Sequence, residues 1–186
     1  TKNPKTLILS GPKKRGAYTS SHIYTTHINS FYYHMTDLGY AANILHEALH
    51  CMMVSNYIYA QGDTSMLNAL AREYGFLYNG LFTDPILKSV AESITPQHDL
   101  MLDRYQNVFA TALYQFALAK NISITLEYCM DLAFWGAYDS QAFLTISDPN
   151  TKDRILSRIA AEQDPSGNIA TQMGLPIIPS KGNPCP

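Results

Sequence analysis

The sequence has little of what would place a chain in a specialised class of protein. No apolar run approaches the roughly 20 residues that a helix needs to span a bilayer. Only three cysteines are present, Cys51, Cys129 and Cys185, which indicates neither a disulfide framework nor a cysteine-rich zinc motif. The 13 Lys and Arg residues are balanced by 15 Asp and Glu residues. The resulting net charge of −2 gives no indication of a nucleic-acid or membrane-surface partner.

What is present is the composition of one globular domain. Apolar residues make up 46% of the 186 residues and charged residues only 15%, enough to bury a core without crosslinks. From Asp164 onward, five prolines and three glycines oppose regular structure. We therefore predict a domain over residues 1–163 and an extended Pro/Gly-rich tail over residues 164–186. The first residue is Thr1 rather than Met, as expected of a processed or trimmed chain.

The order of elements predicted from local patterns is a few strands followed by many helices. Apolar and β-branched runs predict strands over residues 6–9 and 22–33. Thr36-Asp37 offers an N-cap oxygen to a helix over residues 38–59. Ser123, and then Asn150 or Thr151, are expected to cap two of the later helices. Those later helices are predicted over residues 64–74, 85–91, 95–120, 123–135, 140–146 and 151–160.

The predicted helix over residues 38–59 carries a pattern with specific chemistry, the H-E-x-x-H formed by His46, Glu47 and His50. Residues four apart share one face of a helix, so both imidazoles can bind the same Zn²⁺. Glu47 lies about 100° further round the helix than His46. From there it can reach a water on the open side of the metal and act as its general base.

A catalytic zinc needs a third protein ligand, and we predict that His98 supplies it. His98 lies in the first turn of the helix over residues 95–120, in phase with the apolar residues Leu102, Tyr105 and Phe109. The alternative interpretation is an ordinary core histidine on an apolar face. His27, in the middle of the predicted strand, could line the cleft, but we expect it at an exposed strand position. The carboxylates that compete for the role of third ligand are Asp99, Asp103, Glu127 and Asp131, with Asp103 the nearest rival.

These segments resemble the zincin-like metallopeptidases, and the SprT-like type in particular. The resemblance runs over roughly residues 23–146 and is carried by the capped helix that reads A-A-N-I-L-H-E-A-L-H over residues 41–50. Gln97-His98-Asp99 and the L-A-F-W-G of residues 132–136 fit the same pattern more loosely. The resemblance implies an α+β fold, predominantly helical, with a small antiparallel sheet packed on the metal-binding helix. Its edge strand, residues 23–32 here, would capture an extended peptide by β-augmentation.

The resulting hypothesis is a zinc metallopeptidase that acts on a peptide or protein substrate. Zn²⁺ is the expected cofactor, His46, His50 and His98 its ligands, and Glu47 the general base. A different class of function is also open, namely a protein-binding module that keeps the same scaffold without turnover. A third hypothesis is an effector or toxin domain of a larger secreted protein.

Overall fold

The protein is described by a computed structural model, which places residues 17–20, 25–28, 34–60 and 94–185. Side chains are described for residues 34–53 and 97–185. The predicted strand over residues 6–9 and the two predicted helices between residues 64 and 91 lie outside the described residues. The helices are α1 (Asp37–Ala60), α5 (Ile94–Leu100), the π-helix η3 (Met101–Tyr105), α6 (Gln106–Ala119), α7 (Leu126–Leu132), α8 (Gln141–Leu144), α9 (Pro149–Gln163) and α10 (Asn168–Met173).

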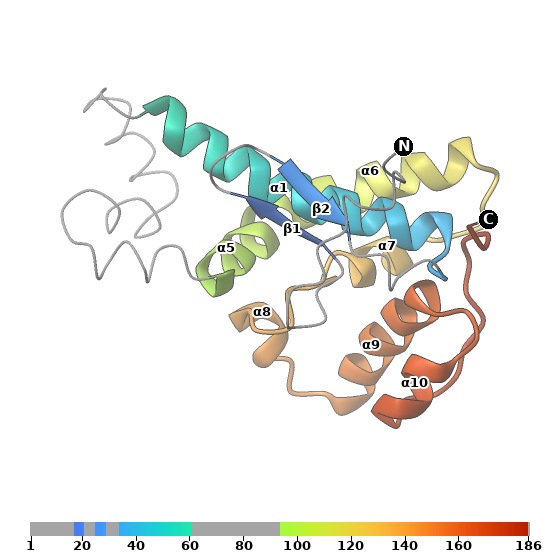
Figure 1. The fold of residues 1–186 in the computed structure, drawn as a ribbon. Helices are drawn as coiled ribbons and strands as arrows, with labels where there is room; N and C mark the ends of the chain where they lie inside the picture. Colours follow the sequence, from blue (N-terminus) through green and yellow to red (C-terminus); the bar gives the residue numbers. More distant parts are fainter. Residues whose placement is uncertain (1–16, 21–24, 29–33, 61–93, 186) are drawn as a thin grey trace.

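Helix α1 confirms the helix predicted over residues 38–59 and is the longest described element. The Oγ1 of Thr36 accepts a hydrogen bond from the amide of Gly39 at 3.0 Å, so Thr36 caps the helix as predicted. Leu38, Ala42 and Met53 are buried on one side of it. Figure 1 shows α1 running across the molecule next to α6, with α9 and α10 on the opposite side of the core. No described helix is long and apolar enough to cross a membrane.

The predicted helix over residues 95–120 is present as the unbroken succession α5, η3 and α6. Its middle turn is a π-helix rather than an α-helix, and both flanking residues, Leu100 and Gln106, keep helical dihedrals. Beyond that turn the buried side is formed by Phe109, Ala110, Leu113 and Ala117. These residues join Leu38 and Ala42 of α1 and residues of α7 in a single hydrophobic core.

The later helices agree with prediction in position but begin at different caps. Helix α7 is capped by Thr125, whose Oγ1 accepts from the amide of Tyr128, and not by the predicted Ser123. Helix α9 is capped by Asp148 and not by Asn150 or Thr151, because its carboxylate accepts from both of their amides. The short helix predicted near residue 140 is α8, and Ser140 is its cap.

The predicted α+β, zincin-like fold with a small antiparallel sheet is wrong. Where side chains are described, 66% of the residues are helical and none lies in a strand. Elsewhere in the described chain, β1 (Ala17–Ser20) pairs with β2 (Thr25–Ile28), and this is a single hairpin beside α1. An isolated two-stranded hairpin is at best marginally stable and does not form a layer of its own. Only the predominantly helical part of the prediction agrees, and that loosely.

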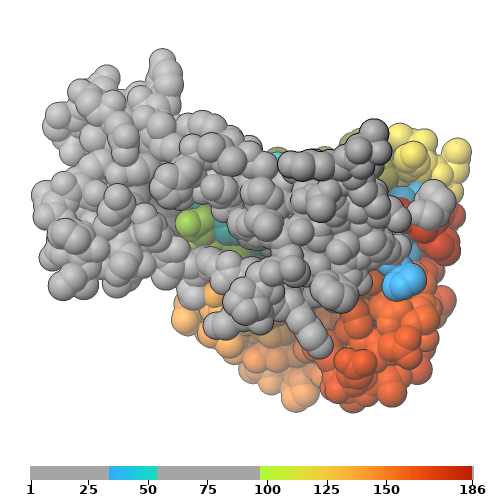
Figure 2. All heavy atoms as spheres, in the orientation of Figure 1, coloured from blue at the N-terminus to red at the C-terminus, as the bar shows by residue number. Residues whose placement is uncertain are grey.

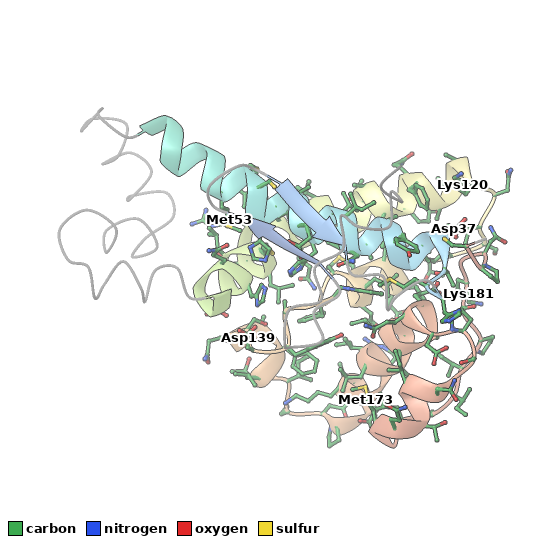
Figure 3. The ribbon with its side chains drawn as sticks, in the orientation of Figure 1. Asp37, Met53, Lys120, Asp139, Met173 and Lys181 are labelled. Atoms are coloured by element: carbon green, nitrogen blue, oxygen red, sulfur yellow. The ribbon has the colours of Figure 1, made fainter. Side chains whose placement is uncertain are left out.

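The C-terminal segment is attached to the first turn of α1 through the buried carboxylate of Glu162. Its Oε1 accepts from the Tyr128 hydroxyl at 2.7 Å and from the Lys181 amide at 2.6 Å. Its Oε2 accepts from the Thr36 hydroxyl and from the Gly182 amide. Figure 3 shows Lys181 on the same side of the molecule as Asp37.

The predicted tail therefore contains ordered contacts and also one helix, α10, in its proline-free stretch over residues 168–173. The expectation that prolines exclude regular structure there is wrong for those six residues. In the space-filling view, α9, α10 and the segment that follows form one continuous surface (Figure 2). Whether residue 163 is a domain boundary stays a prediction.

Candidate metal centre

Three histidines from two helices meet inside the protein. His46 and His50 lie one turn apart on α1, and His98 comes from α5. One ring nitrogen from each lies within 4.8 Å of the others, and all three side chains are buried. The ring centroids are 4.7 Å apart for His46 and His50, 5.1 Å for His46 and His98, and 5.3 Å for His50 and His98. These three histidines could therefore hold a metal ion, whose identity the geometry leaves open.

One pair of nitrogens in the cluster has nearly the separation that a small tetrahedral ion requires. Two nitrogens held about 2.0–2.1 Å from such an ion lie about 3.3–3.4 Å from each other. The Nε2 atoms of His46 and His50 are 3.1 Å apart, close to that separation. The Nε2 of His98 is buried and has no hydrogen-bond partner in the part of the chain that the structure describes. A buried nitrogen without a partner is costly, and a bound metal would satisfy it.

The two Nδ1 atoms on the outer side of this cluster are held by polar side chains. The Nδ1 of His50 lies 2.6 Å from Oε1 of Gln97, the neighbour of His98 on α5. The Nδ1 of His98 lies 2.6 Å from Oδ1 of Asp139, in the turn before α8. Figure 3 shows Asp139 at this turn, below α5. Such contacts on the far nitrogen are typical of metal-binding histidines.

The third ring, that of His46, is confined by the backbone at Gly136. A Cβ added to Gly136 would lie 3.0 Å from Cε1 and 3.1 Å from Nε2 of His46. Gly136 has a φ of +75°, which side-chain-bearing residues rarely adopt. Glycine meets both the steric requirement and the φ requirement, because it has no Cβ. Gly136 therefore lies in the turn after α7 and also packs directly against the His46 ring.

Burial and mutual proximity keep the imidazoles of His46 and His50 neutral. Desolvation is the main cause that lowers the pKa of His46 well below 6.5, and His50 and His98 add to it. Desolvation is also the main cause that lowers the pKa of His50, to about 4. The hydrogen bond with Gln97 and the charge of Asp139 oppose this shift, whereas the nearby His98 adds to it. Neutral imidazole is the form that binds a metal.

Glu47 lies next to His46 on α1, and its side chain is only 4% exposed. A glutamate directly after the first histidine of H-E-x-x-H is placed to act on the metal's open position. The glutamate of the motif is therefore buried, as are the three histidines.

The competing ligands lie elsewhere. Asp103 is exposed and pairs with Arg104 at 2.9 Å. Asp131 is buried but accepts from Arg154 and Arg158. The remaining two carboxylates are also engaged away from the cluster: Glu127 is an exposed partner of Arg158, and Asp99 accepts from the amide of Gln141.

The other candidate from the sequence, His27, is described only through its backbone pairing with Tyr18. Two residues that touch the site, Asp139 and Gln97, were not predicted. The sequence carries no signal for either contact beyond their proximity to Gly136 and His98, because each depends on how distant segments pack.

Comparison with known proteins adds no relative: no protein-family model, curated protein or solved structure matches this chain.

Proposed function

We propose that this chain hydrolyses peptide bonds with a zinc ion held by His46, His50 and His98. The observation that carries the proposal is the three-histidine cluster built on H-E-x-x-H, together with the burial of Glu47, the residue that follows His46. Three nitrogen ligands with a fourth position open are the ligand set of catalytic zinc. Imidazole also binds copper, iron and nickel, so zinc is proposed from among several metals that accept nitrogen ligands.

The chemistry divides between the metal and the protein. A zinc ion in such a site lowers the pKa of bound water to about 7 and polarises a carbonyl. Glu47 would accept the proton of the attacking water and return it to the leaving amine. His46 and His50 would stay neutral throughout, because burial opposes their protonation. The proposed substrate is a peptide or protein segment.

The enclosure of the site also favours one alternative, a metal-holding module that binds proteins without turnover. His46, His50 and His98 are each no more than 9% exposed, as in sites where a metal only supports the fold. A glutamate in the general-base position argues against it, because a structural site has no use for that group.

The test replaces Glu47 by Gln in the full chain. Glu47→Gln keeps the shape of the side chain but cannot take up a proton, so peptide hydrolysis should fall by about 10²–10⁴-fold. Zinc content, measured by elemental analysis, should stay near one equivalent per chain. Glu127→Gln is the matched control, since Glu127 is an exposed partner of Arg158, and it should leave both measurements unchanged.

Comparable turnover by Glu47→Gln would remove Glu47 from the reaction. A wild-type protein that binds zinc and cleaves nothing in a broad library of quenched fluorescent peptides would favour the binding module instead.

A further inference from the structure

We propose that Asp139 and Gln97 are positioning residues that fix the tautomers of His98 and His50, so that both Nε2 lone pairs face His46. The inference rests on the metal site of the proposed function and not on hydrolysis. Each of the two residues lies 2.6 Å from an Nδ1 atom on the outer side of the cluster. The two contacts differ in kind, because one partner is a carboxylate and the other an amide.

The carboxylate contact determines which ring nitrogen of His98 donates a hydrogen bond. An ionised carboxylate only accepts hydrogen bonds, so Nδ1 of His98 must donate its N–H to Asp139. A neutral imidazole then carries a lone pair on the other nitrogen. That nitrogen, Nε2, is buried and has no hydrogen-bond partner among the described residues. Without Asp139, nothing in these contacts would hold the proton on the outer nitrogen.

The amide contact does the same for His50 when its oxygen faces the ring. Oε1 of Gln97 accepts from Nδ1–H, which leaves the Nε2 of His50 as an acceptor. In the metal-free protein the Nε2–H of His46 can then donate to it across 3.1 Å. An amide turned by 180° would present its NH₂ group instead and reverse this assignment. The orientation of Gln97 is therefore a specific and testable part of the inference.

Helix α5 holds both contacts in place through three consecutive residues. Gln97 meets His50, His98 joins the cluster, and the carboxylate of Asp99 accepts from the amide of Gln141 at 2.5 Å. Gln141 begins α8, two residues beyond Asp139. The carboxylate of Asp139 is 44% exposed, but its turn is fixed by this bond and by the fully buried Ser140, whose hydroxyl donates to the Ala137 carbonyl at 2.7 Å.

The first experiment reads the tautomers directly, in metal-free protein, by long-range ¹H–¹⁵N NMR of the histidine rings. His98 and His50 should both appear as Nδ1–H tautomers in the wild type. Asp139→Ala should convert His98 to a mixture, whereas Asp139→Asn, whose amide oxygen can still accept, should preserve Nδ1–H. Gln97→Glu leaves only acceptors at that position, so the tautomer of His50 should not change. A wild-type His98 protonated at Nε2, or a tautomer of His50 that switches in Gln97→Glu, would overturn the corresponding assignment.

The second experiment measures the affinity for Co²⁺, whose visible spectrum reports coordination. Removing an outer contact of this kind weakens metal binding by about 10–100-fold, which is the fall expected for Asp139→Ala and for Gln97→Ala. Asp103→Asn is the matched control, because Asp103 is an exposed carboxylate one turn along the same helix, and it should change nothing. Affinities equal to wild type in both alanine variants, with circular dichroism unchanged, would refute a positioning role. If the protein binds metal but does not hydrolyse peptides, the histidine tautomers and the Co²⁺ affinities should still change as predicted. The proposed hydrolysis and the positioning roles of Asp139 and Gln97 can therefore be refuted independently.

Discussion

Replacing Gly136 by alanine perturbs the metal centre through a single added methyl group. The new Cβ would lie 3.0 Å from Cε1 and 3.1 Å from Nε2 of His46, closer than ordinary van der Waals contact. The ring must then move by a few tenths of an ångström. Its space is limited, because the rings of His50 and His98 lie 4.7 and 5.1 Å away between centroids. Gly136→Ala should therefore displace one ligand from the position that the other two require.

The expected loss of unfolding free energy in Gly136→Ala has a backbone part and a steric part. A side chain at a left-handed φ destabilises the folded state by about 1–2 kcal/mol. The alanine also reduces the entropy of the unfolded chain, which offsets about 0.4–1 kcal/mol of that loss. Overpacking against a buried ring adds about 1–3 kcal/mol. The free energy of unfolding of metal-free Gly136→Ala should thus fall by about 2–4 kcal/mol. Metal affinity should fall by at least about tenfold, which corresponds to 1.4 kcal/mol.

Gly174→Ala separates the two parts. Gly174 has a similar φ of +68°, but no atom lies within 4 Å of its added Cβ. This variant should lose only the backbone part, about 1 kcal/mol of unfolding free energy, and should bind metal like the wild type. The assays are urea unfolding of metal-free protein and competition with a chromophoric chelator. Equal metal affinities in the two variants would refute the contact between the Gly136 backbone and His46.

Two further predictions concern the third ligand and the attachment of the C-terminal segment. His98→Ala should weaken metal binding sharply in the same chelator competition, whereas Asp103→Ala should not, since only the histidine lies in the cluster; the opposite ranking would remove His98 from the site. Glu162→Gln should lower the free energy of unfolding by about 3–5 kcal/mol in urea titrations, because a buried carboxylate that accepts four hydrogen bonds loses part of its acceptors. The control Glu127→Gln removes an exposed ion pair and should cost under about 1 kcal/mol, and equal losses in both variants would contradict the role given to Glu162.

Local sequence patterns were sufficient to predict the elements that depend on near neighbours. The cap at Thr36, the apolar face beyond it and the four-residue spacing of His46 and His50 all lie within α1. The helix that begins near residue 95 was predicted in the same way. Two caps were misplaced. The oxygen that caps α7 belongs to Thr125, two residues after the predicted Ser123, and the one that caps α9 belongs to Asp148, which precedes the predicted Asn150 and Thr151 and is followed by Pro149. In the second case the order cap-then-proline was itself present in the sequence.

The sheet and the outer contacts of the metal site depend on distant residues and could not be predicted. β-branched and aromatic residues over 22–33 favour extended backbone, but a sheet needs partner strands that no local pattern specifies. Among the described residues only Thr25–Ile28 of that run is paired, with β1. Asp139 meets His98 across 41 residues because the chain returns after α7 and places the turn before α8 below α5. No spacing rule connects that aspartate to the histidine.

The position of His98 was predicted from a regular α-helix, but the helix in the structure is interrupted by a π-helical turn. At 100° per residue, Ala110 and Ala117 would lie about 120° and about 100° away from His98 around an uninterrupted α-helix. The π-helical turn η3 contains about one residue more than an α-helical turn. The residues after it are therefore rotated by about 100° around the helix axis, relative to an uninterrupted α-helix. Both alanines then come within about 20° of His98, and both are fully buried. The π turn thus lets one helix bury its α6 face against α1 while it still directs His98 toward His46 and His50, and a strict 3.6-residue period contains no signal for it.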